Sequence, residues 1–180
     1  NVITVPLNTL ISSGQTVRFS YVKQNNVMDI SDLGGRMLVN FGPVAIENNS
    51  AIDRVAPVLQ SIEVPTTGDR LILKYNEAMG STFPAVNTTN FGVTVGGAAW
   101  LPTSMSVDGE NIILNGPATI EIGKTVVLTK YTAPTANVIT TNAAIQDTSG
   151  NDAASLSNRA VTNKSTLDIT APTVSAVTTN

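Results

Sequence analysis

Gly123-Lys124-Thr125-Val126-Val127-Leu128-Thr129-Lys130-Tyr131 is the stretch that decides the fold. β-branched and other apolar residues dominate it, which favours a pleated, half-buried strand. Its opening is also repeated, because Gly14-Gln15-Thr16-Val17 matches Gly123-Lys124-Thr125-Val126 at an offset of 109 residues. The strand therefore belongs to a segment that the chain contains more than once.

The chain also aligns with itself at a second offset, of 115 residues, and this alignment extends over about 30 residues. Three later segments repeat three earlier ones at this offset: Ile145–Gly150 repeats Ile30–Gly35, Ala160–Ser165 repeats Ala45–Ser50, and Asp168–Pro172 repeats Asp53–Pro57. The change of offset implies that the first copy is six residues shorter between Tyr21 and Ile30. Self-similarity at a fixed period indicates a tandem array of modules.

The register predicts three parts of the chain. Residues 56–170 form one complete unit of about 115 residues, residues 1–55 are the C-terminal half of a preceding unit, and residues 171–180 begin the next one. A unit of this length can bury a stable core of its own without disulfide bonds or a bound metal. Residues 1–55 alone expose an apolar face and open strand edges. Two alternatives would complete them: upstream residues of a longer chain, or a neighbouring molecule that donates Ala171–Asn180 in head-to-tail assembly.

The rest of the complete unit also reads as short strands separated by turns. Asp108-Gly109 favours a tight hairpin because both residues tolerate positive φ. One helical turn is expected at Tyr75–Met79. The other strands are expected at Val58–Val64, Arg70–Tyr75, Phe91–Val95, Ser104–Val107 and Asn111–Leu114. Strands at this spacing predict an all-β, two-sheet sandwich.

Composition excludes several classes of function. The chain has no histidine and no cysteine, so the commonest general base, the Ser-His and Cys-His nucleophiles, disulfides and the usual zinc ligands are all absent. We therefore expect no enzyme activity. The net charge of -3 and the scattered lysines and arginines argue against nucleic-acid binding. No apolar run is long enough to span a membrane.

Four motifs in a fixed order carry a family resemblance. They are Leu71–Met79, Asn90–Gly97, Gly123–Pro134 and Ile145–Ala154. In this order they resemble the bacterial immunoglobulin-like repeat of giant cell-surface proteins, the type found in the cyanobacterial swimming protein and in long adhesins. The resemblance implies an immunoglobulin-like Greek-key sandwich and an extracellular, cell-surface location. The first copy departs from the motif, because Asp32-Leu33-Gly34-Gly35-Arg36 replaces the Asp-x-x-Gly-Asn turn.

Calcium is the one cofactor that the residues suggest. Asp53 and Asp168 immediately precede the linkers between units, and hard cations bind oxygen ligands of this kind. Asp147, Asn151 and Asp152 share one turn, and Glu77 follows a strand. The alternative is that these residues only brace turns, since Asp and Asn accept hydrogen bonds from their own backbone. The EF-hand spacing is absent.

Two functions from different classes remain. The first is a structural spacer or stalk in an exported surface protein or adhesin, which projects or assembles an extracellular layer or filament through contacts between neighbouring repeats. The second is a glycan- or protein-binding module that uses loops at one end of the sandwich. Trp100, the only tryptophan, is expected to pack in the core or at a sheet edge and not to stack on a carbohydrate.

Overall fold

The computed structural model describes all residues except 1, 25–28, 81–87, 134–143 and 177–180. The chain divides into two compact units, residues 1–54 and residues 55–180, and each is described by itself. Among the described residues the only helical element is the three-residue 3-10 turn η1 at Thr88–Asn90. No described helix is long and apolar enough to cross a membrane. The all-β prediction is confirmed.

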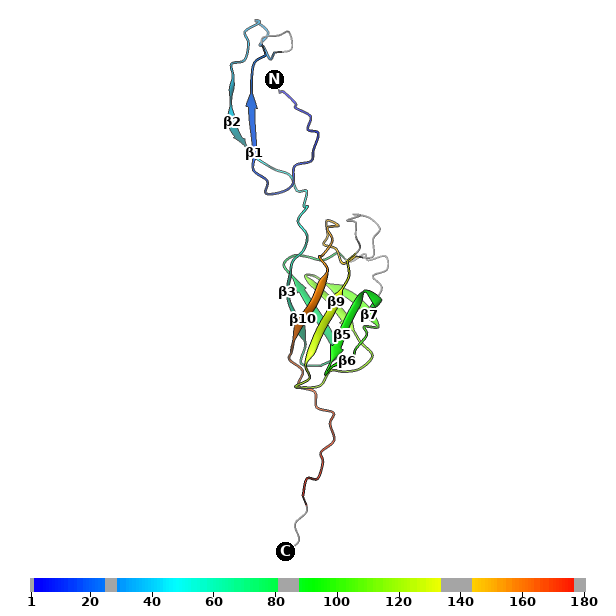
Figure 1. The fold of residues 1–180 in the computed structure, drawn as a ribbon. Coiled ribbons are helices and arrows are strands. Elements are labelled where there is room, and N and C mark those ends of the chain that lie inside the picture. The colour runs from blue at the N-terminus through cyan, green and yellow to red at the C-terminus, as the bar shows by residue number, and fades with distance from the viewer. Residues whose placement is uncertain (1, 25–28, 81–87, 134–143, 177–180) are drawn as a thin grey trace. The chain divides into compact units, whose positions relative to one another are not determined.

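The second unit is a sandwich of two four-stranded layers. One layer has the order β6-β5-β9-β10, and the other has the order β3-β4-β8-β7 (Figure 1). A short parallel pairing of β10 with β3 joins the layers, with Thr162 opposite Glu63 and Asn163 opposite Val64. The strands are β3 (Leu59–Val64), β4 (Arg70–Tyr75), β5 (Phe91–Val95), β6 (Ala98–Ala99), β7 (Ser104–Asp108), β8 (Asn111–Asn115), β9 (Val126–Tyr131) and β10 (Leu156–Asn163).

Most of the strands predicted in this unit are found within one residue of their expected bounds. The predicted hairpin is found, but its turn is shifted by one residue, because Asp108 pairs with Asn111 and the two central residues are Gly109, with φ 58°, and Glu110. The helical turn predicted at Tyr75–Met79 is wrong. The N–H of Asn76 donates a 3.1 Å hydrogen bond to the carbonyl of Val58, and its side-chain Oδ1 accepts a 2.6 Å bond from the N–H of Val58. Met79 forms a bridge with Asp147.

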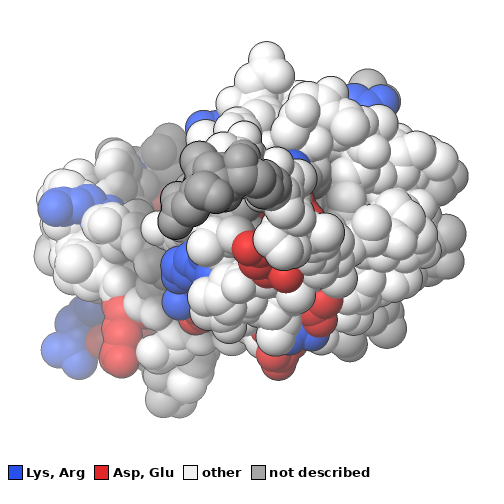
Figure 2. Space-filling model, turned by 90° about the horizontal axis from the view of Figure 1, so that it is seen from below, with Lys and Arg blue, Asp and Glu red and all other residues white. Residues whose placement is uncertain are grey.

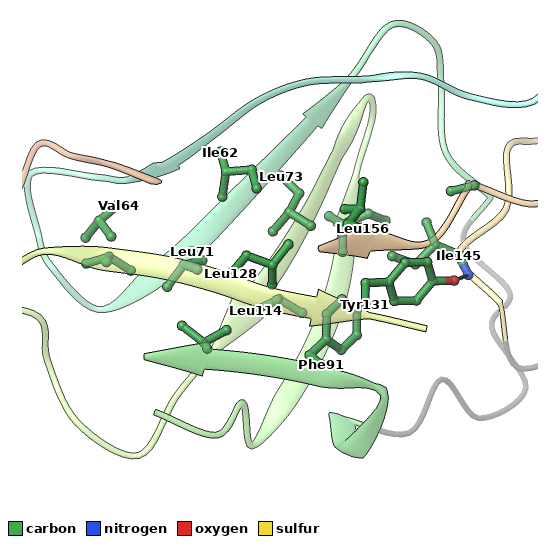
Figure 3. Close-up of a cluster of buried hydrophobic side chains, with 14 of the residues drawn as sticks. Ile62, Val64, Leu71, Leu73, Phe91, Leu114, Leu128, Tyr131, Ile145 and Leu156 are labelled. Carbon is green, nitrogen blue, oxygen red and sulfur yellow. Dashed lines mark hydrogen bonds between the residues drawn. The ribbon is translucent and has the colours of Figure 1, made fainter. Parts of the chain in front are cut away.

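Alternate residues of the strands fill the space between the layers. In β4, Leu71, Leu73 and Tyr75 point inward and are buried. The rings of Phe91 and Tyr131, from neighbouring strands, stack with their centroids 5.1 Å apart (Figure 3). Both rings belong to one layer and are buried between the two sheets, and burial of such side chains is the main source of stability in a sandwich.

Trp100 is part of this core, as the sequence predicts. Only 4% of its surface is exposed, and its indole N–H donates a 2.8 Å hydrogen bond to the carbonyl of Ala118. A Cβ atom at Gly116 would lie 1.9 Å from the Trp100 ring. The tryptophan therefore requires glycine at position 116.

The first unit contains a two-stranded antiparallel sheet, β1 (Val17–Tyr21) with β2 (Phe41–Ile46). The pairing shifts by one residue between Phe19 and Tyr21, whereas the pairing of β9 with β10 is regular. Gly42 lies at this bulge with φ 122°, and a Cβ atom there would lie 2.3 Å from the Cβ of Ser20.

The bulge shows where the first copy loses the six residues by which it is shorter. Tyr21 faces Phe41 just as Tyr131 faces Leu156. One of the six missing residues is therefore lost within β1, and five are lost between Tyr21 and Ile30. The sequence prediction that all six lie after Tyr21 is wrong, because a strand can lose one residue at a bulge without losing its partner.

The two units share a set of hydrogen bonds at the offsets seen in the sequence. The side-chain amide of Asn163 donates to the carbonyls of Glu121 and Lys124, at 2.8 and 3.0 Å. The amide of Asn48 donates to the carbonyls of Ser12 and Gln15, at 2.8 and 2.9 Å. Asn163 is the last residue of β10 and Asn48 follows β2, so each asparagine ties the end of this region of its unit to the turn that precedes the partner strand.

Candidate functional site: the Asp147 turn

Asp147 organises a turn on the chain segment between β9 and β10. Its side chain is buried, and Oδ1 accepts hydrogen bonds from the backbone N–H groups of Ser149 and Asn151, at 2.7 and 2.9 Å. Oδ2 accepts a 2.8 Å bond from the side-chain amide of Asn151. Gly150 takes the positive φ, 85°, that the turn requires.

The loop after β4 braces this turn from the other layer. The N–H of Gly80 donates to the carbonyl of Gln146 at 2.9 Å, and the N–H of Thr148 donates to the carbonyl of Ala78 at 3.2 Å. A Cβ atom at Gly80 would lie 2.8 Å from the carbonyl oxygen of Asp147. The close approach of the two backbones therefore depends on glycine at position 80.

Glu77 belongs to the same loop, and one of its carboxylate oxygens lies within 4.8 Å of a carboxylate oxygen of Asp147. Two carboxylates at this separation repel each other unless a proton or a cation lies near them. Each Asp147 oxygen already accepts hydrogen bonds within the turn. The arrangement can therefore brace the turn by itself, and it offers oxygen ligands that a hard cation prefers.

The other predicted residues of this turn are also brought together. Asn151 is buried and holds the Asp147 carboxylate, as described above. Asp152 is half-buried, and its Oδ1 accepts a 2.8 Å hydrogen bond from the side-chain amide of Gln146. Both residues have partners that fit a structural turn, which is the alternative that the sequence left open.

The first unit builds the same turn around Asp32. Its Oδ1 accepts from the N–H groups of Gly34 and Arg36, both at 2.9 Å, and Oδ2 accepts a 2.9 Å bond from the Arg36 guanidinium. These hydrogen bonds to Arg36 and Gly34 hold the pKa of Asp32 below its ordinary value. The arginine thus takes the place of Asn151, and the departure from the motif leaves the bracing intact.

The linker aspartate Asp168 lies at the opposite end of the second unit from Asp147. It follows Leu167, whose carbonyl accepts a 2.8 Å bond from Ile122 before the start of β9, whereas the Asp147 turn lies beside the end of β9. Asp168 is exposed, and its Oδ1 accepts a 2.9 Å bond from the N–H of Thr170. Asp53, its counterpart at the offset of 115, is half-buried and lies in the first unit.

Charged side chains do not gather on the face shown in Figure 2, where acidic and basic groups lie singly or in mixed groups among uncharged residues. Several lysines are paired with a nearby carboxylate: Lys164 Nζ lies 2.6 Å from Glu63, and Lys124 Nζ lies 3.3 Å from Glu121. This face therefore lacks the clustered positive charge that nucleic acid would require.

The sequence analysis did not identify the structural hydrogen bonds that the side chains of Asn48 and Asn163 donate. The signal was available, because both residues fall within the segments repeated at the offset of 115. Asparagine inside a strand is unfavourable unless its side chain has a specific partner. An asparagine that recurs at the end of a repeated strand therefore indicates a structural hydrogen bond.

Comparison with known protein families finds a match to a repeat. Residues 52–136 match the model of a family described as "Putative flagellar system-associated repeat". No curated protein and no solved structure matches the chain. The matched residues include β3 to β9 and end before the Asp147 turn and β10. The match is to a repeat, and it fits a repeat of a surface or motility protein.

Proposed function

We propose that this chain is a structural spacer built from copies of one β-sandwich unit, in an exported bacterial surface protein or adhesin. Residues 56–170 are one complete copy, residues 1–55 are the C-terminal half of another, and residues 171–180 begin a third. The observation that carries the proposal is that the Asp32 and Asp147 turns are held by the same hydrogen bonds at the same offset. The family match, which is to a repeat, supports it.

Within this proposal the unit is an immunoglobulin-like Greek-key sandwich. The first and last strands, β3 and β10, lie side by side in parallel, and β4 pairs with β8, which is distant in sequence. Long connections between neighbouring strands are a feature of Greek-key sandwiches. The short linkers that end in Pro57 and Pro172 would limit bending between copies, because proline fixes its own φ and restricts the residue before it.

The proposed role is not catalytic. The chain offers no histidine or cysteine, and each Asp147 carboxylate oxygen accepts a hydrogen bond within its own turn. A spacer in an extracellular layer or filament needs a stable core and neighbours of its own kind. The buried core of the complete copy and the short linkers meet those needs, and the location would be the cell surface or the secreted fraction.

The proposal is tested with concatemers of residues 56–170 that contain increasing numbers of copies. Small-angle X-ray scattering should give a maximum dimension that grows by a constant amount with each added copy, because short proline-containing linkers keep successive units extended. A maximum dimension that levels off would contradict a stalk. Antibodies against the unit should label intact cells of the source organism, and labelling only after permeabilisation would contradict surface location.

A glycan- or protein-binding module is the second candidate, and one observation favours it. The segment between Tyr131 and Ile145 is five residues longer than the corresponding segment between Tyr21 and Ile30. Residues 134–143 lie outside the described part of the chain. Variation at one end of a sandwich is typical of loops that bind partners. Specific binding of a glycan by the complete unit, lost when this loop is shortened, would favour this candidate.

We also propose calcium as a stabilising ion for the array. Glu77 and Asp147 supply oxygen atoms within 4.8 Å of each other in the complete unit. The sequence adds Asp53 and Asp168 immediately before each linker. Cation binding that stiffens junctions would suit a spacer.

A further inference from the structure

The first and last strands of the second unit run side by side in the same direction. β3 and β10 pair in parallel, with Thr162 opposite Glu63 and Asn163 opposite Val64 (Figure 1). Because the two strands are parallel, the chain enters β3 at one end of the unit and leaves β10 at the opposite end. Tension along the chain therefore pulls these two paired strands in opposite directions.

The parallel pairing continues past the end of β10. The N–H of Lys164 donates a 3.0 Å hydrogen bond to the carbonyl of Val64. The N–H of Thr166 donates a 3.1 Å bond to the carbonyl of Thr66. The ammonium group of Lys164 also lies 2.6 Å from a carboxylate oxygen of Glu63. Neither strand can slide along the other without straining all of these contacts.

The end of β10 is held on its other side as well. The side-chain amide of Asn163 donates to the carbonyls of Glu121 and Lys124, at 2.8 and 3.0 Å. Just beyond it, the N–H of Ile122 donates a 2.8 Å bond to the carbonyl of Leu167. Neighbours on both sides must therefore release this segment before the unit can open at this end.

The start of β3 is anchored to the neighbouring strand β4. The N–H of Val58 donates a 2.6 Å bond to Oδ1 of Asn76, which follows β4. The N–H of Asn76 donates a 3.1 Å bond to the carbonyl of Val58. Tension that arrives through residues 55–57 is therefore passed to β3 and β4 together.

Hydrogen bonds between two strands resist pull differently in two directions. When the strands are pulled along their length in opposite directions, every bond between them is strained together and all must break in one step. When the strands are peeled apart from one end, the bonds break one after another. Forced unfolding is governed by the rate of unfolding, so the first direction, which has the higher barrier, withstands the larger force.

We propose that the second unit bears tension along the chain, and that the parallel contact of residues 63–66 with residues 162–166 is its mechanical clamp. The inference deepens the proposed function, since a spacer between a cell and a distal domain transmits pull from one end of each unit to the other. The unit unfolds at high force when it is pulled from the two ends that it has in the chain. It unfolds at low force when the same two strands are peeled apart.

Two attachment points distinguish these directions. The chain has no cysteine, so one introduced cysteine gives a unique site for a handle. Val55→Cys, pulled against the C-terminal end of the chain, strains the clamp along its strands. Thr66→Cys, pulled against the same end, peels the clamp open. Both side chains are exposed, so both cysteines are accessible to the handle.

Single-molecule force spectroscopy should give an unfolding force several times higher for Val55→Cys than for Thr66→Cys. The length released, at about 3.3–3.6 Å per residue, identifies the second unit in each trace. Equal forces at the two attachment points, or a higher force for Thr66→Cys, would overturn the inference.

A further variant tests the hydrogen bonds of the clamp. Thr166→Pro removes the N–H that bonds to Thr66, so it should lower the force for Val55→Cys and leave the peeling force almost unchanged. Thr170→Pro is the matched control, because the N–H of Thr170 bonds to Asp168 outside the clamp, and it should lower neither force. An equal fall in both directions for Thr166→Pro would indicate a general loss of stability and contradict the clamp.

The spacer proposal is judged separately, by the concatemer dimensions and by the labelling of intact cells. Concatemers that lengthen by a constant amount per copy, together with equal forces at the two attachment points, would keep the spacer and reject the clamp. A clear difference between the two forces, with concatemers whose dimension levels off, would keep the clamp and reject the spacer.

Discussion

The backbone N–H of Ile145 donates a 2.7 Å hydrogen bond to the phenolic oxygen of Tyr131 inside the sandwich (Figure 3). Ile30 and Tyr21 form the corresponding bond in the first unit, at 3.2 Å. In both units the last residue of a strand thus holds the chain segment that leads into the aspartate turn. The bond connects the core to the candidate site.

Tyr131→Phe should destabilise the second unit by about 1–3 kcal/mol, because it leaves the N–H of Ile145 buried without its acceptor. Tyr75→Phe is the matched control. The Tyr75 hydroxyl is equally buried and has no hydrogen-bond partner among the described residues, so its removal should be neutral or stabilising. Urea denaturation of both variants measures the difference, and equal losses of stability would contradict the assigned role.

Alkaline pH should unfold the second unit over a defined range. Burial raises the pKa of Tyr131 to about 12, and burial also raises the pKa of Tyr75. Since both folded-state values lie above the unfolded value of about 10, this contribution to stability is complete below about pH 10 and is lost as pH rises towards about 12.

Melting temperatures measured across that range should fall steeply, with tyrosinate absorbance rising together with unfolding. The Tyr75→Phe variant should show a shallower fall, because it has one fewer buried phenol to ionise. Tyrosinate absorbance that appears in full while the protein is still folded would contradict the prediction.

The sequence was most informative where packing is regular. In β4 every second residue of Arg70–Tyr75 is apolar and buried, so period-two alternation located the strand. β10 was not predicted as a strand, because only Leu156, Ala160 and Val161 of its eight residues are apolar and most of its side chains are exposed. Its pairing with β9 and β3 is decided by neighbours that are distant in sequence, which a local pattern cannot reveal.

The candidate site could be predicted only in part, for a related reason. Asp147 and Asn151 share a turn that the sequence identified directly. Glu77 lies near Asp147 because of the path of the loop after β4. A helical turn was predicted for this loop, but its Met79 instead forms a β-bridge with Asp147. Propensity favoured a helical turn there, and the tertiary bridge overrode it.

Gly116→Ala should destabilise the protein through a clash with the ring of Trp100. Overpacking of this kind typically costs about 1–3 kcal/mol. Trp100→Ala should itself cost about 3–5 kcal/mol, because it leaves a cavity and removes the bond to Ala118. A double-mutant cycle tests the contact: Gly116→Ala should be far less harmful in the Trp100→Ala background, and additive losses would show that the two residues do not interact.

Asp147→Ala should loosen the turn, because it leaves the buried N–H of Asn151 without its acceptor. A loss of about 1–3 kcal/mol is expected for each buried donor left unpaired. Hydrogen exchange should accelerate at Asn151, while β4 exchange remains slow. Asp108→Ala, in an exposed hairpin, is the control and should leave exchange at Asn151 unchanged.

Calcium binding should raise the melting temperature, since an ion that binds only the folded state adds RT ln(1 + [L]/Kd) to its stability, about 2.7 kcal/mol at a hundredfold excess over Kd. Glu77→Gln removes one carboxylate near Asp147 without changing its shape, so the gain should shrink in this variant. Glu110→Gln is the control, because Glu110 is exposed and lies beside Lys74, and the gain should persist.

The linker residues are tested by combining Asp53→Ala with Asp168→Ala. Melting curves that coincide in chelator and in millimolar calcium would leave these carboxylates as turn residues only. A gain that survives Glu77→Gln and the double linker variant would place the ion elsewhere.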